Sequence, residues 1–156
     1  MGTPVISEHN YHLLRAAEHE ITRLASLDLH YGWGGGRNCG NVPCTDYNHG
    51  DIAGDCSWLA AVACDKLGRI VAWPGNTYTL AIEGHEGHGR MFTMHIKNFA
   101  DPAQSHVILE FKHHKHTRWA ECGGFDNPSA FGGPSWFRPS EERVSEFPIK
   151  RHFKGF

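Results

Sequence analysis

The sequence has no uninterrupted apolar run that approaches the roughly 20 residues needed to cross a membrane. Its first residues, MGTPVISEHNYHLLRAAEHE, have neither the basic start nor the apolar stretch of a secretory signal. Lys and Arg number 15 against 17 Asp and Glu, so no basic excess attracts nucleic acid or an anionic membrane. These absences predict a chain without a signal peptide, whose partners are neither nucleic acid nor membrane.

A dense, even set of cysteines is also missing. The 5 cysteines are an odd number, spread over 156 residues, unlike a small disulfide scaffold. At least one thiol is therefore expected to be free. Cys39 and Cys44 are compatible with a disulfide or with two unrelated loop cysteines. A hydrophobic fraction of 40% suffices for one core, so residues 1–156 are predicted to form one domain.

The first half of the chain has helical patterns separated by a long loop. Apolar residues recur at steps of three and four from Ser7 to about residue 27, which predicts an amphipathic helix capped by Ser7. Residues 30–55 are rich in glycine and polar side chains and are expected to form a loop. Residues 56–67 are apolar nearly all round, which is typical of a buried central helix, with Asp55 as its N-cap.

The second half changes to the period of β-strands. Residues 73–77 favour a turn followed by a short helix, and residues 83–90 a loop. The alternation in MFTMHIKN and HVILEFK predicts two strands, and TRWAEC a third. An edge strand is predicted within VSEFPIKRHF because of its proline. The expected fold class is α+β, with helices first and an antiparallel sheet second.

Cys56 stands where the central helix is predicted to begin. A thiol in the first turn of a helix is close to the positive end of the helix dipole and to unpaired backbone N–H groups. Both favour the thiolate, which is the nucleophilic form. Cys64 lies two turns further on, within the apolar run, and is interpreted as a core residue.

A nucleophilic cysteine needs a base and a group that orients this base. His106 opens a predicted strand and can face the helix from the end of the sheet. If residues 113–116 form the hairpin loop, the antiparallel count pairs Ile108 with Glu121. Glu121 then shares a face with His106, whereas a loop of three or five residues would reverse this parity.

Three stretches resemble the NlpC-type cell-wall peptidases of the papain-like superfamily. They are HYGWGGG at 30–36, GDCSWLAAVA at 54–63 and SHVILEF at 105–111, in the order and approximate spacing of that family. The resemblance implies a papain-like fold, in which the helix that carries the nucleophile packs on the antiparallel sheet. It further implies that Cys56 is the nucleophile and His106 the base. The third catalytic member is a polar residue on the following strand, for which Glu121 is the candidate.

The same resemblance implies a substrate. The expected reaction is hydrolysis of an amide in the peptide stem of peptidoglycan through a thioester, by a monomer that needs no cofactor. Residues expected to contact the substrate are Trp33, Asp55, Ser57 and Trp58. The family usually has glycine where Trp58 stands, so this side chain is expected to reshape or narrow the groove.

The end of the chain, FGGPSWFRPSEERVSEF, resembles peptidase modules encoded by phages of actinobacteria. With no export signal, this implies a phage lysin, or an enzyme carried in the virion, that acts on the wall after release. A toxin delivered by a secretion machine remains an alternative. One departure from the family is NFADPAQSH, which replaces its Pro-Gly-Asp turn before the histidine strand.

Two other classes of function compete with a peptidase. A non-catalytic wall-binding or phage tail module could use the aromatic side chains of Trp33, Trp58, Trp136 and Phe137. The presence of both Cys56 and His106 favours catalysis over this alternative.

A metal site is the second competitor. The sequence offers several groups of potential ligands, but none has two ligand pairs at a spacing known to fold around zinc. We therefore expect no metal. The groups are His113, His114 and His116; His85 and His88; and Cys39 with Cys44.

Overall fold

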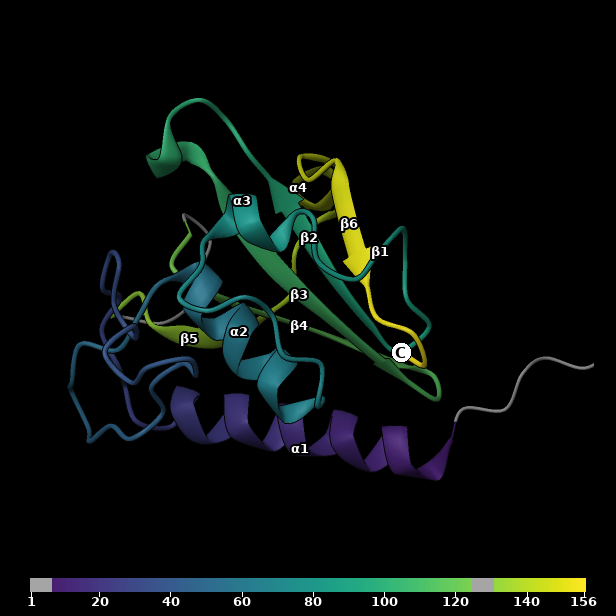
Figure 1. Cartoon of the computed structure of the whole chain (residues 1–156), viewed down its shortest axis with the longest axis horizontal. Coiled ribbons are helices and arrows are strands. Elements are labelled where there is room, and N and C mark those ends of the chain that lie inside the picture. Colours follow the sequence, from purple (N-terminus) through teal and green to yellow (C-terminus); the bar gives the residue numbers. More distant parts are fainter. Residues whose placement is uncertain (1–6, 125–130) are drawn as a thin grey trace, which may run out of the picture.

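The computed structural model describes residues 7–124 and 131–156, and in these residues it is an α+β fold (Figure 1). The helices are α1 (Glu8–Ala25), α2 (Cys56–Lys66), α3 (Thr77–Leu80) and α4 (Glu141–Ser145), with a 3-10 turn at Pro102–Gln104. The strands are β1 (His85–Glu86), β2 (Phe92–Lys97), β3 (His106–His113), β4 (His116–Cys122), β5 (Pro134–Phe137) and β6 (Ile149–His152). They form one antiparallel sheet in the order β1-β6-β2-β3-β4-β5.

Helix α1 forms where its apolar periodicity predicts. The Ser7 side chain accepts a hydrogen bond from the backbone N–H of Asn10, which caps the helix. The face that carries Leu14, Ile21 and Leu24 is buried against α2 and β5. Although α1 is the longest helix described, no helix in the described ranges is long and apolar enough to cross a membrane.

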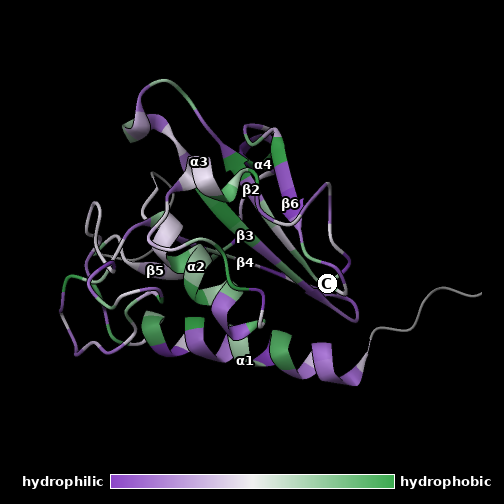
Figure 2. Ribbon diagram, in the orientation of Figure 1, coloured by the Kyte–Doolittle hydropathy of each residue, from purple (hydrophilic) through white to green (hydrophobic). Residues whose placement is uncertain are grey.

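Helix α2 lies between α1 and the sheet, where it contacts β3 and β4 (Figure 1). Its side chains are buried from Cys56 to Cys64, which explains why the sequence is apolar all round. Figure 2 shows hydrophobic residues on α2 and along β3. The prediction of a buried helix packed on an antiparallel sheet is confirmed.

The two faces of the sheet differ in chemistry. Met94, Val107 and Leu109 belong to the same buried apolar cluster as the side chains of α2, so they form the inner face. The opposite, outer face carries buried polar side chains, among them His106 and Glu121. The sheet therefore places titratable groups on the side away from the main core.

The β3–β4 hairpin is tighter than predicted, because His113 pairs with His116 instead of both lying in the loop. Because the loop loses one residue at each end, the pairing of residues between β3 and β4 stays as predicted. Leu109 pairs with Ala120, and the next step of the register places Ile108 opposite Glu121. Glu121 therefore lies on the same face as His106, as expected.

Two predictions for the side of the sheet that carries β1 and β6 were wrong. The segment 83–90 contains β1, and β6 is not an edge strand but lies between β1 and β2. Residues 141–145, which overlap the predicted edge strand, form α4. Strand β5 was not predicted. β1 and β5 are too short to show a period, and Pro148 precedes β6 without interrupting its ladder.

Candidate functional site

Cys56 is the first residue of α2, at the end of the sheet. The side chain of Asp55 accepts a hydrogen bond from the backbone N–H of Trp58 at 2.9 Å, so Asp55 is the N-cap. The remaining N–H groups of the first turn and the positive end of the helix dipole are therefore near the sulfur. Cys56 is 9% exposed, and its side chain borders a cavity.

His106 and Glu121 form a buried pair beside this thiol. The His106 Nε2 atom lies 2.7 Å from a carboxylate oxygen of Glu121. Cys56 and His106 border the same cavity, and Cys56 is among the groups that raise the pKa of the imidazole. Because Nε2 is taken by Glu121, the Nδ1 atom is the ring nitrogen left for the sulfur. The structure thus brings the three predicted residues together, in the order thiol, imidazole, carboxylate.

The environment of His106 favours its charged form. Burial lowers its pKa, but hydrogen bonds with Cys56 and Glu121, and negative charge on both, outweigh burial and raise the pKa to about 9. The imidazole therefore holds a proton at neutral pH. A charged imidazole next to a cysteine is the arrangement that favours a thiolate.

Arg143 on α4 and Phe147 just after this helix support the pair. The Arg143 guanidinium lies 3.8 Å from the Glu121 carboxylate, and the Phe147 ring packs 6.0 Å from the His106 ring. Gly124 closes over the same carboxylate with a φ of 101°, and a Cβ there would come within 2.7 Å of it. Only glycine fits at this position.

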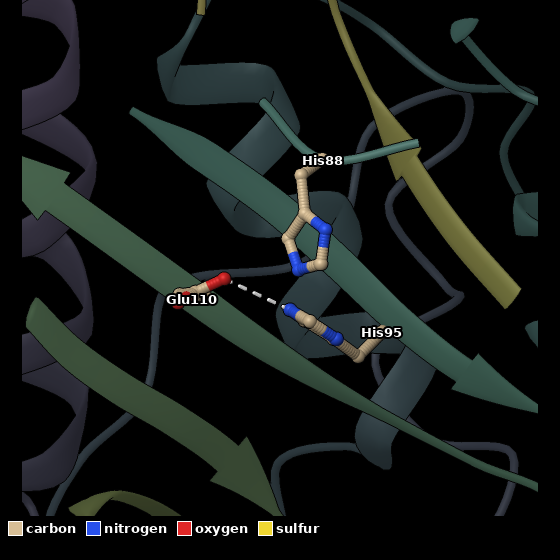
Figure 3. A group of neighbouring side chains, drawn as sticks. All are labelled: His88, His95 and Glu110. Atoms are coloured by element: carbon tan, nitrogen blue, oxygen red, sulfur yellow. Dashed lines mark hydrogen bonds and ion pairs between the residues drawn. The ribbon is translucent and has the colours of Figure 1, made fainter. Parts of the chain in front are cut away.

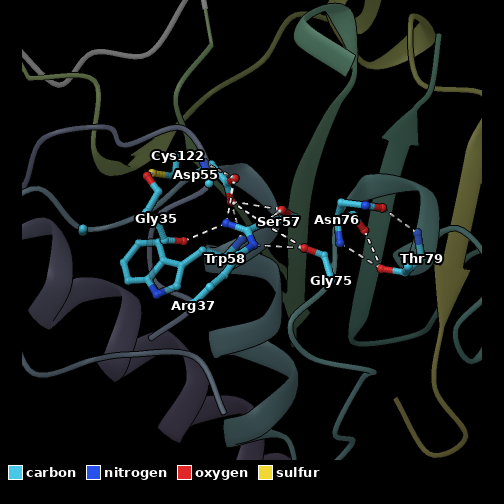
Figure 4. A network of polar contacts seen from close by, with 12 residues as sticks. Gly35, Arg37, Asp55, Ser57, Trp58, Gly75, Asn76, Thr79 and Cys122 are labelled. Atoms are coloured by element: carbon cyan, nitrogen blue, oxygen red, sulfur yellow. Dashed lines mark hydrogen bonds and ion pairs between the residues drawn. The ribbon is translucent and has the colours of Figure 1, made fainter. Parts of the chain in front are cut away.

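Arg37 holds the start of α2 against the loop before it (Figure 4). Its guanidinium donates hydrogen bonds to Asp55 at 2.9 Å, to Ser57 at 2.8 Å and to the Gly75 carbonyl at 2.8 Å. It also lies over the Trp73 ring, 4.8 Å from the centroid. Asp55 and Ser57 border the cavity as expected, but Arg37 engages their oxygen atoms, so they position the helix start.

Trp58 borders neither of the two cavities beside Cys56, in contrast to the sequence prediction of a substrate contact. It is 0% exposed, and its indole N–H donates to the Cys44 carbonyl at 2.7 Å. Cβ atoms at Gly36 or Gly54 would collide with its ring, at 2.1 and 2.4 Å. Trp58, the residue after Asp-Cys-Ser, points into the core. Glycines at 36 and 54 make room for its ring, and the ring does not project into either cavity beside Cys56.

Replacing Trp58 with phenylalanine is therefore expected to affect stability and not substrate binding. The change removes the hydrogen bond to the partly buried Cys44 carbonyl and opens a small cavity, which together cost about 1–3 kcal/mol. Urea unfolding followed by circular dichroism measures this loss. A variant of unchanged stability but raised KM would instead restore the role in substrate contact.

Two cavities meet at the thiol. One, of about 260 Å³, extends from Cys56 toward Asn76 and Tyr78. The other, of about 330 Å³, extends from Cys56 toward His106 and Lys97. Tyr31, Trp33 and Cys56 border both cavities. Trp33 is 66% exposed at this boundary, as a substrate-contacting residue should be.

Tyr31 is a site residue that we did not select from the sequence, although it lies in the quoted HYGWGGG stretch. Burial raises its pKa, and negative charge at Cys56 and Asp55 raises it further. The phenol therefore keeps its proton and remains a hydrogen-bond donor beside the sulfur. The sequence signal that could have identified Tyr31 is an aromatic residue with a hydroxyl group in the loop that leads to Cys56.

The other cysteines are not reactive in the same way. Cys39 and Cys44 form a disulfide, which settles the alternative left open above. Cys64 and Cys122 are free but fully buried, and burial raises the pKa of both thiols. Neither borders the two cavities around Cys56.

Of the potential metal ligands named above, only His88 belongs to a group whose ligand atoms converge in the described residues. Its companions are His95 and Glu110, on the outer face of the sheet. His113 instead faces Glu18, with its Nε2 atom 3.5 Å from the carboxylate. The sequence did not reveal this group because its members come from three segments.

Comparison with models of known protein families, with curated proteins and with solved structures finds no match for this chain. The chemistry of the site is therefore argued from its geometry. The parts are a thiol at a helix start, an imidazole that contacts it, and a buried carboxylate behind the imidazole.

Proposed function

We propose that the protein is a cysteine peptidase that cleaves an amide in the peptide stem of bacterial peptidoglycan. The observation that carries the proposal is the chain of contacts from Cys56 through His106 to Glu121 at the meeting point of two cavities. A nucleophile, its base and an orienting group within bonding reach are what acyl transfer requires. The peptidoglycan substrate follows from the family resemblance of the sequence.

In the first step the Cys56 thiolate attacks the carbonyl carbon of the amide. The carbon–sulfur bond forms, and the carbonyl oxygen takes up negative charge. We assign the stabilisation of this oxygen to backbone N–H groups at the start of α2, with the hydroxyl of Tyr31, which borders both cavities, as a further donor. The His106 imidazolium then gives its proton to the leaving amine as the carbon–nitrogen bond breaks.

In the second step a water molecule hydrolyses the thioester. His106, now neutral, takes a proton from the water, whose oxygen attacks the carbonyl carbon. The carbon–sulfur bond breaks, the product leaves as a carboxylic acid that gives its proton to the solvent, and thiolate and imidazolium are restored. Glu121 keeps the ring in the orientation that presents Nδ1 to the sulfur throughout.

The two cavities suit a substrate that extends on both sides of the bond to be cut. Lys97 and Arg143 border the cavity on the His106 side and provide positive charge near a peptide that carries free carboxylates. The exposed Trp33 at the boundary offers an apolar surface to the substrate backbone. We place the enzyme, as a monomer, among phage lysins or virion-associated wall hydrolases.

Catalysis accounts for the site better than binding alone. Of the aromatic side chains that a wall-binding module would use, Trp58 is buried and Trp136 donates its indole N–H to Thr22. Only Trp33 is strongly exposed among them. A buried His106–Glu121 pair beside a thiol contributes nothing to binding a sugar or a peptide.

Digestion of purified peptidoglycan followed by mass analysis of the soluble fragments tests the proposal. One stem amide should be hydrolysed, which adds one water to the sum of the fragment masses and exposes a new amino group. Treatment with iodoacetamide, which alkylates an accessible thiolate, should abolish the cleavage. Walls that release no new amino groups would contradict the proposal, as would cleavage that survives complete alkylation of Cys56.

A further inference from the structure

Three potential metal ligands converge on the outer face of the sheet, apart from the thiol. They are His88, from the segment between β1 and β2, His95 on β2, and Glu110 on β3 (Figure 3). One ligand atom from each lies within 4.8 Å of the other two. Figure 3 shows a ring nitrogen of His88 directed toward the space between Glu110 and His95.

The sheet register explains how two of these residues meet. His95 is paired with Ile108, and Thr93 is paired with Glu110, so His95 and Glu110 are diagonal neighbours on one face. The His95 Nε2 atom lies 2.9 Å from a Glu110 oxygen. His95 is 0% exposed, so its ring is fixed by its surroundings.

His88 completes the group from outside the sheet. Its ring centroid lies 5.2 Å from that of His95, with the planes inclined by 67°. Two imidazoles that share one zinc ion, with nitrogen atoms about 2.1 Å from the metal in a tetrahedral arrangement, have centroids roughly 5 Å apart. The two rings are thus already spaced as ligands of one ion.

We propose that His88, His95 and Glu110 bind one zinc ion, with water as a fourth ligand. Two imidazoles and one carboxylate are a donor set that zinc accepts. The ion would join the segment before β2 to β2 and β3, so its role is to stabilise this part of the fold. The proposal does not depend on the peptidase function.

The surroundings leave the ligand atoms available. Lys112 Nζ lies 3.6 Å from the Glu110 oxygen that does not face His95, which orients the carboxylate. The Trp119 ring packs 4.9 Å from the His95 ring and holds its plane. The His95 Nδ1 atom is buried, whereas Nε2 is the ring nitrogen that faces Glu110 and the proposed ion.

Zinc binding by the full chain tests this site. Isothermal titration is carried out on the Cys56→Ser variant, which removes the accessible thiol as a competing ligand. We expect one zinc ion per chain and a rise in melting temperature of about 5 °C or more at a hundredfold excess over Kd. Adding His88→Ala, an exposed position whose change should not disturb folding, should abolish both effects.

The matched control is His85→Ala, which removes an exposed histidine of the same segment that lies outside the group. It should bind zinc as before. Cobalt(II) in place of zinc should give visible absorption bands without a thiolate charge-transfer band. The proposal is overturned by absent binding, by binding that survives His88→Ala, by loss of binding in His85→Ala, or by a thiolate band in the cobalt spectrum.

Discussion

Replacing Cys56 with alanine lowers kcat/KM for cleavage of peptidoglycan by about 10⁴-fold or more, since the attacking sulfur is lost. Alanine keeps the helix start, because the cap hydrogen bond runs from the Trp58 N–H to the Asp55 side chain and does not involve residue 56. Both cavities persist as well. The variant should therefore still bind peptidoglycan while releasing no peptides, as measured by wall sedimentation and by mass analysis.

Cys64→Ala is the matched control for this experiment. It removes an equally small thiol from the same helix, two turns away and fully buried. Only a modest loss of stability is expected, with cleavage retained. Cleavage by Cys56→Ala at the rate of the unaltered protein would eliminate the thiol mechanism. If both variants fold by circular dichroism and both lose cleavage, the loss results from a disturbed α2 and does not identify Cys56 as the nucleophile.

Replacing His106 with alanine lowers kcat/KM by about 10²- to 10⁴-fold, the usual contribution of general acid–base catalysis. The effect on the pH profile is more specific. Since the pKa of His106 is raised to about 9, the imidazolium that protonates the leaving amine persists through neutral pH and is lost as the pH rises through that value. Activity should fall in the same range, and the alanine variant should lack this alkaline decline.

The Glu121→Gln variant, measured over the same pH range, shows whether Glu121 acts on His106 through its charge or only through packing. Glutamine keeps the size of the side chain but removes the negative charge that helps raise the pKa of His106. The alkaline decline should move to lower pH by about one unit or more. An unchanged midpoint, with activity merely reduced, would mean that Glu121 acts through packing alone.

Helices α1 and α2 could be predicted from local periodicity, and the shared face of His106 and Glu121 from the short hairpin between their strands. Leu14 to Leu24 repeat with the period of a helix, and the apolar run after Cys56 is long enough to define a buried one. The face shared by His106 and Glu121 needed only the parity of a hairpin loop. The predicted loop was too long by one residue on each strand, and this error does not change which face Glu121 occupies.

The rest depends on contacts between distant segments. Arg37 reaches Asp55 and Gly75 across a loop whose glycines have no period. Trp58 follows the Asp-Cys-Ser motif directly, yet its burial depends on glycines at 36 and 54. Helix α4 is 5 residues long, so its sequence carries almost no helical signal, although Arg143 lies beside Glu121.

The guanidinium of Arg37 has a consequence for the order in which the protein matures. It ties residues 35, 55, 57 and 75 into one cluster, while the partner of the sulfur arrives on a strand some fifty residues downstream of Cys56. A nascent chain that includes this cluster but not yet β3 therefore has the thiol without His106. Under the proposed mechanism, Cys56 therefore becomes a nucleophile only when the sheet is complete.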